Sequence, residues 1–132
     1  MQRTPTNVIN WLAENLGIEA NIRFIGYDEA FGTPPDTTVG SCIRVYDVNC
    51  NVRYDIRIRK TGQTPIEMLH VFAHELRHVW QYENNKLTSE YGVWEGVDYI
   101  DAVEFHRELP EEIDAEAYAD SVIGQLIATF GG

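Results

Sequence analysis

Hydrophobic and polar residues alternate most regularly in the segment 52–59. There Val, Tyr and two Ile residues are separated by Arg, Asp and Arg. A period of two places apolar side chains on one face of a β-strand and polar side chains on the other. Together with the apolar segment 43–48 and the turn residues 49–51, this pattern predicts a β-hairpin with one solvent-exposed face.

Three other segments carry the wider apolar spacing that is typical of helices. The first covers 8–16, and Thr6 or Asn7 is its expected N-cap. The other two each begin with proline, which favours the first helical position. One is predicted from 65 to about 83, where a Thr followed three residues later by Glu forms a capping box. The last is predicted from 110 to 131.

The remaining segments connect these elements. An apolar stretch at 22–25 is predicted to be a first strand, and 28–40 is rich in Gly, Pro and Thr and is predicted to be a loop. The segment 84–109 is expected to be a long loop with a short helix near 97–105. The fold class is therefore α+β, with a small antiparallel or mixed sheet. A chain of 132 residues has the size of one domain, so we expect a single domain over 1–132.

The composition excludes several classes of function. The chain has ten Lys and Arg residues and a formal net charge of −11, which repels a phosphate backbone, so we expect no nucleic-acid partner. No apolar run approaches the roughly 20 residues that a membrane helix needs, and the N-terminus lacks the apolar part of a secretory signal. We therefore expect a cytoplasmic protein without a membrane partner. The sequence does not indicate an oligomeric state.

The two cysteines are predicted to be free thiols. Cys42 and Cys50 do not have the spacing of a CxxC pair. If Val48 pairs with Asn51 in the predicted hairpin, Cys42 lies opposite Arg57 rather than opposite Cys50. This register weighs further against a disulfide.

The predicted helix 65–83 contains the sequence HELRH. Two residues that are four apart on a helix lie on the same side, so His74 and His78 can both offer an imidazole to one zinc ion. Glu75 lies about 100° away around the axis, where a carboxylate can act as general base toward a water molecule. The apolar face of this helix consists of Met68, Phe72, Leu76 and Val79. The opposite, polar face is predicted to consist of His70, His74, His78 and Gln81.

The last helix supplies candidates for a third zinc ligand. On a helical wheel Glu112 and Glu116 fall on the inward, mostly apolar face, whereas Asp114 falls on the far side. A buried carboxylate costs several kcal/mol unless a cation or strong hydrogen-bond donors compensate it. A metal ion held by two histidines would meet that need. Capping of the helix or pairing with Arg is the structural alternative for both glutamates.

The sequences HELRH and EIDAEAYA, the latter covering 112–119, together resemble the gluzincin zinc metallopeptidases. The second motif of that clan reads E-x-x-A-D/N-x-F-A, and the similarity is greatest to the prenyl-protein peptidase type and to the small ImmA/IrrE-like peptidases. The resemblance implies a zincin-like fold and a Zn²⁺ cofactor bound by His74, His78 and Glu112. It also implies Glu75 as catalytic base and a peptide or protein as substrate. Glu116 stands where the family has Asp or Asn, a position that orients a ligand histidine.

Some assignments within this resemblance stay open. Glu116 could be the ligand, with Asp120 four residues on, and His106 could replace Glu112. In such enzymes an edge strand beside the active-site helix binds the extended substrate, and 52–59 is the nominated strand. Candidates for stabilising an oxyanion are Tyr91, Tyr99 and His106.

Two other classes of function compete with the peptidase. One keeps the fold and the metal but is a binding or regulatory module without catalysis, or a non-peptidase hydrolase. The other is an acidic interaction domain of phage or mobile-element origin in which the motif is accidental. His70, one helical turn before the motif, is expected to be a surface residue rather than a ligand.

Overall fold

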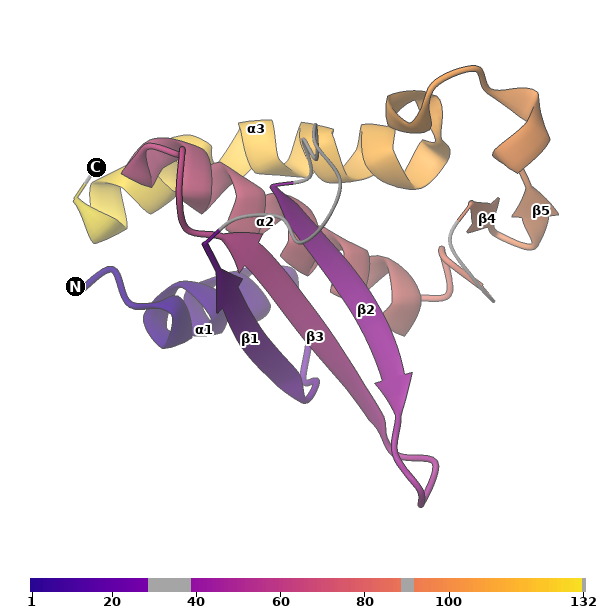
Figure 1. Ribbon diagram of the computed structural model, residues 1–132, viewed down its shortest axis with the longest axis horizontal. Helices are drawn as coiled ribbons and strands as arrows, with labels where there is room; N and C mark the ends of the chain where they lie inside the picture. Colours follow the sequence, from indigo (N-terminus) through magenta and orange to yellow (C-terminus); the bar gives the residue numbers. More distant parts are fainter. Residues whose placement is uncertain (29–38, 89–91, 132) are drawn as a thin grey trace.

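The computed structural model describes residues 1–28, 39–88 and 92–131. It is a mixed structure of helices and small sheets, as the predicted α+β class requires. The second helix packs against one face of a three-stranded sheet, and the first and third helices pack against the second (Figure 1). None of the described helices is both long and apolar enough to cross a membrane.

The sheet consists of β1 (Ile22–Tyr27), β2 (Gly40–Tyr46) and β3 (Val52–Arg59). Their order is β1-β3-β2, with β1 parallel and β2 antiparallel to β3, so the sheet is mixed. The predicted strand 22–25 is confirmed and extends to 27. Most of the predicted loop 28–40 lies outside the described residues. β3 has the densest apolar alternation, and it is the central strand because its inner side chains Tyr54, Ile56 and Ile58 are buried under the helices.

The hairpin register differs by one residue from the prediction. Cys42 pairs with Ile56, not with Arg57. The turn is longer than expected, because Asp47 accepts hydrogen bonds from the backbone N–H groups of Asn49 and Asn51 at 2.8 and 2.9 Å. This Asx turn ends the strand at Tyr46, and a slip by one residue moves every side chain of β2 to the other face. Both cysteines are nevertheless free, as predicted.

Helix α1 (Pro5–Leu16) begins three residues earlier than predicted. Its N-cap is Thr4 rather than Thr6 or Asn7, and the Thr4 hydroxyl accepts from the N–H of Asn7 at 3.1 Å. A threonine cap followed by proline at the first helical position begins α2 in the same way, so the sequence contained the relevant pattern.

Helix α2 (Pro65–Glu83) has the predicted bounds and the predicted capping box at Thr64 and Glu67. It lies between the sheet and helix α3, so it is covered on two sides. The predicted polar face of α2 lies toward α3. His78 and Gln81 are buried, because α3 covers that side of the helix.

The segment 84–109 does not form the predicted short helix. It contains a hairpin of β4 (Val93–Trp94) and β5 (Val97–Asp98) and two 3₁₀ turns, η1 (Ile100–Ala102) and η2 (His106–Glu108). The hairpin turn is Glu95-Gly96, and both residues have positive φ angles, of 48° and 84°. Two-residue hairpin turns favour this conformation, so the dipeptide that was read as part of a loop closes a hairpin.

Helix α3 (Pro110–Phe130) has the predicted bounds, but its buried face is rotated from the predicted one. Glu111 is buried, and Asp114 faces α2 rather than solvent, because it forms an ion pair with Arg77. Glu116 was predicted to face inward and is 55% exposed. The fully buried positions of α3 are Glu111, Ala115, Ala119 and Leu126.

The first prediction concerns the core under α2. Leu76 is completely buried, so Leu76→Ala should lower the free energy of unfolding by about 2–5 kcal/mol. Ile66→Ala on the same helix is the control, because Ile66 is 45% exposed and its truncation leaves no cavity. Urea unfolding of both variants measures the difference. Equal losses for the two variants would contradict the described packing of α2.

Candidate metal centre

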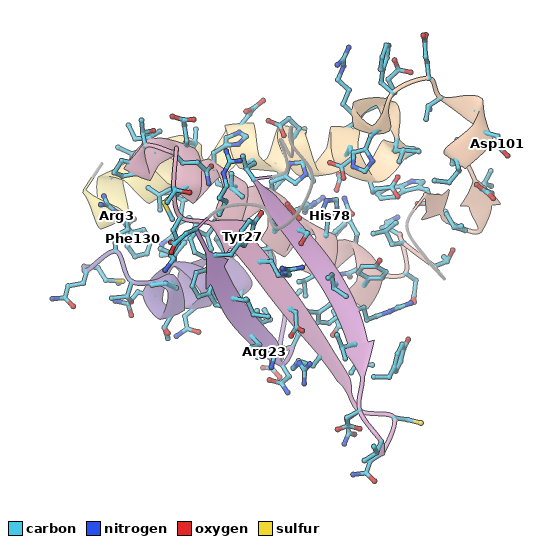
Figure 2. All side chains as sticks on the ribbon, viewed as in Figure 1. Arg3, Arg23, Tyr27, His78, Asp101 and Phe130 are labelled. Carbon is cyan, nitrogen blue, oxygen red and sulfur yellow. The ribbon has the colours of Figure 1, made fainter. Side chains whose placement is uncertain are left out.

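The contact between α2 and α3 brings two histidines of HELRH to one carboxylate of the last helix. The Nε2 atom of His74 lies 2.7 Å from Glu112 Oε2, and the Nε2 atom of His78 lies 3.3 Å from Glu112 Oε1. Figure 2 labels His78 on α2, at the part of the molecule where α2, α3 and β2 meet. The Glu112 side chain is only 11% exposed. Each oxygen of one carboxylate thus faces one imidazole.

These three side chains fit a metal ion. One ligand atom from each of His74, His78 and Glu112 can be chosen so that all three lie within 4.8 Å of one another. Ligands of a tetrahedral zinc ion with bonds of about 2.0–2.1 Å lie about 3.3 Å apart, so small side-chain movements would suffice. Two imidazoles and a carboxylate are also a donor set that zinc uses in catalytic sites.

The second ring nitrogen of each histidine is held as well. His74 Nδ1 lies 2.8 Å from Glu116 Oε2, and His78 Nδ1 lies 2.7 Å from Gln81 Oε1. Metal-binding histidines commonly donate their other ring N–H to an oxygen in this way, which fixes the orientation of the ring. Glu116 therefore occupies the position that an orienting residue requires. The sequence predicts Gln81 on the polar face of α2 without a role, and the structure shows it buried against His78.

Glu75 lies beside the three potential ligands without belonging to them. Its side chain is 8% exposed, and its Oε1 atom is 3.9 Å from His78 Nε2. Burial raises the pKa of the Glu75 carboxyl, and the adjacent histidines His78 and His74 act in the opposite direction. A buried carboxyl next to a metal position, with its pKa raised from the ordinary value, is suited to accept a proton and release it again.

The side chains of the three potential ligands, His74, His78 and Glu112, interact strongly with one another in the absence of a metal ion. Burial alone would lower the pKa of His74, but the hydrogen bond to Glu112 and the charges of Glu75, Glu112 and Glu116 raise it to about 9. Burial alone would raise the pKa of Glu112, but its hydrogen bonds with His74 and His78 lower it to about 2. The metal-free centre thus holds protons where a cation could bind.

The other candidate residues take different positions. His106, in η2, is exposed, and its Nε2 atom lies 3.2 Å from Glu112 Oε1. It lines the groove beside the centre, but it is not part of the group of three donors. Tyr99 is not among the described residues that line this groove, and Tyr91 lies outside the described residues.

His70 continues the chain of contacts toward solvent. It lies on α2, and its Nε2 atom is 2.8 Å from Asp120 Oδ1 and 3.5 Å from Glu116 Oε1. Asp120 thus contacts His70 and not the HELRH histidines, which weighs against the alternative frame with Glu116 as ligand. The carboxylates of Asp120 and Glu116 are both more than half exposed.

A groove of about 900 Å³ opens over the centre. One wall is α2 with Glu75, and the other is strand β2, from Gly40 to Arg44 and at Tyr46. Gly40 allows the two walls to approach, because a Cβ atom there would lie 2.6 Å from Val71 Cγ1 and 3.3 Å from Glu75 Cγ. The nomination of 52–59 as the edge strand was wrong. β3 is paired on both sides, and β2 is the edge strand along the groove.

The chain was compared with known proteins at three levels. No family model, no curated protein and no solved structure matches it. Functional inference therefore depends on the geometry of the centre itself.

The second prediction concerns the stability of metal-free protein. The raised pKa of His74 stabilises the fold fully below the ordinary value of 6.5, and this contribution is lost as pH rises through about 9. The lowered pKa of Glu112 stabilises the fold above 4.5, and this contribution is lost as pH falls through about 2. In the presence of a chelator, the free energy of unfolding of wild type should exceed that of His74→Asn by on the order of 1–3 kcal/mol at pH values between 4.5 and 6.5.

Urea unfolding of both proteins across this pH range measures the difference. It should shrink as pH rises from 6.5 to about 9. Zinc affinity should change in the opposite direction over the same interval, because zinc binds neutral imidazole and must displace the protons. A stability difference that is constant over this interval would contradict the described pairing of His74.

Proposed function

We propose that this protein is a zinc-dependent metallopeptidase of the gluzincin type with a zincin-like fold. One observation carries the proposal. Helix α3 presents Glu112 to the Nε2 atoms of both histidines of HELRH, at 2.7 and 3.3 Å. An accidental HExxH on a helix surface would not be expected to meet an inward carboxylate from a second helix. The proposed ligands are His74, His78 and Glu112.

The proposed reaction is hydrolysis of a peptide bond. A bound zinc ion supplies a Lewis acid that polarises the substrate carbonyl and makes a water molecule more acidic. As the water oxygen forms a bond with the carbonyl carbon, Glu75 accepts the proton that the water loses. When the C–N bond breaks, Glu75 returns this proton to the leaving amine nitrogen. The buried position of Glu75 between α2 and β2 supports this role.

The proposed substrate is an extended peptide that binds along β2. Among the described residues β2 is the edge strand of the sheet, and an extended peptide in the groove could add to it as a further strand. β2 lines the groove opposite Glu75, so a peptide bound in this way passes over the centre. His106 lines the groove beside Glu112, whereas Tyr99 does not line it. His106 is therefore the proposed residue for stabilising the negative charge on the carbonyl oxygen.

The third prediction tests the metal. Protein purified without chelator should contain about one zinc ion per chain. His78→Ala and Glu112→Ala should each weaken zinc binding by more than about 100-fold, because each removes a ligand. His106→Ala is the matched control and should retain zinc. Atomic emission analysis and competition with a chromogenic chelator measure both quantities. Zinc that is absent from wild type would leave the acidic interaction domain as the remaining interpretation.

The fourth prediction tests catalysis. Glu75→Gln should keep its zinc and lower kcat/KM on a cleaved peptide by about 10²–10⁴-fold, because the amide cannot accept the proton. Glu14→Gln is the control, since Glu14 is an exposed glutamate on α1. A broad peptide library with mass-spectrometric detection identifies the cleaved peptide. Unchanged turnover of Glu75→Gln would refute the mechanism. A wild type that binds zinc and cleaves no peptide would support the non-catalytic, metal-stabilised module.

A further inference from the structure

Gln81 is a completely buried amide at the contact between α2 and α3. Its Nε2 atom donates to the backbone carbonyl of Glu111 and to Asp114 Oδ2, both at 2.9 Å. A carbonyl oxygen and a carboxylate can only accept hydrogen bonds, so the NH₂ group of the amide must face them. The amide oxygen must then face the remaining partner, which is His78 Nδ1 at 2.7 Å. The orientation of the amide thus follows from its contacts.

This orientation determines which nitrogen of His78 carries the proton. An amide oxygen accepts a hydrogen bond, so the Nδ1 atom of His78 must be the N–H donor. In the neutral ring the Nε2 atom is then left with its lone pair. That atom faces Glu112 Oε1 at 3.3 Å, which is the side from which a metal ion would be bound.

The other end of the amide is fixed as well. Arg77 Nε and a terminal Arg77 nitrogen donate to the two oxygens of Asp114 at 2.7 and 3.1 Å. The guanidinium of Arg77 lies 3.6 Å from the ring centre of Trp80, which restricts its movement. Asp114 is therefore a fixed acceptor for Gln81 rather than a mobile surface carboxylate.

Gln81 also contacts the backbone beside a proposed ligand. The carbonyl of Glu111 that it binds belongs to the peptide group that leads into Glu112. One side chain on α2 therefore holds the ring of His78 with its oxygen and the first turn of α3 with its nitrogen.

We propose that Gln81 is a positioning residue of the metal centre, which sets the Nε2 lone pair of His78 and the approach of Glu112 through one amide group. This inference rests on the proposed function only in that the centre binds a metal ion. A merely structural Gln81 would contribute to stability without determining the tautomer of His78. The tautomer is therefore the discriminating observation.

The fifth prediction has a first part that uses wild-type protein alone. Nitrogen chemical shifts of the His78 ring, measured by NMR in metal-free protein at a pH where the ring is neutral, should show the Nδ1–H form. After addition of zinc, the Nδ1 proton should remain and the Nε2 shift should change. A neutral His78 that carries its proton on Nε2 would overturn the inference.

The second part uses Gln81→Met, which has a similar shape and no hydrogen-bonding amide. In folded protein it should raise the zinc dissociation constant by about 10–100-fold and give a mixture of His78 tautomers. Gln125→Met on the exposed side of α3 is the control and should match wild type. Gln81→Met with wild-type affinity and an unchanged tautomer would overturn the inference. If wild type binds no zinc, the proposed function fails and Gln81 positions no metal ligand, whereas the tautomer in metal-free protein still tests whether Gln81 sets the Nε2 lone pair of His78.

Discussion

The architecture around the groove depends on one constraint: a largely buried carboxylate, Glu112, must have positively charged or hydrogen-donating partners. The carboxylate lies at the contact between α2 and α3, and water reaches little of it. The paired imidazoles of α2 offset its desolvation through hydrogen bonds that lower its pKa to about 2, and His106 Nε2 also lies 3.2 Å from one of its oxygens. The contact therefore fixes the register of the two helices, and it also leaves two Nε2 atoms converging on two oxygens. The contact that stabilises the buried carboxylate is therefore the same contact that gives the geometry of a metal site.

The parts of this arrangement that were predictable from the sequence are local ones. The bounds of α2 follow from its capping box, and the shared orientation of His74 and His78 follows from four-residue spacing on a helix. The inward position of Glu112 follows from its place among apolar residues of α3. Glu116 contacts His74 Nδ1, as the resemblance implied for a residue that orients a ligand histidine. Each of these inferences needs only one helix or one pair of short motifs.

The errors concern relations between elements that are distant in the sequence. β2 is the edge strand because of the order of the strands in the sheet, and the alternation of apolar and polar residues along β3 does not predict that order. Asp114 was placed outward because a helical wheel cannot show that Arg77 approaches it from α2. The polar stripe of α2 that includes Gln81 is a local pattern, whereas the burial of Gln81 depends on α3, the helix that covers the stripe. The register of the hairpin differs by one residue from the predicted one because the side chain of Asp47, not the backbone alone, closes the turn.

Charge balance explains why the same side chains can serve both as a proton-holding cluster and as a metal site. Glu75, Glu112 and Glu116 all act electrostatically on His74, and when all three are ionised and both imidazoles are neutral the cluster carries three negative charges. Protonation of both imidazoles or binding of one divalent cation leaves the same single negative charge. Only the protonated state uses both Nε2 atoms as donors, whereas a bound metal ion would use their lone pairs and would not need the Nδ1 atoms, which contact Glu116 and Gln81. Because these two outer contacts are compatible with either state, exchange of protons for a metal ion would require little rearrangement of α2 and α3.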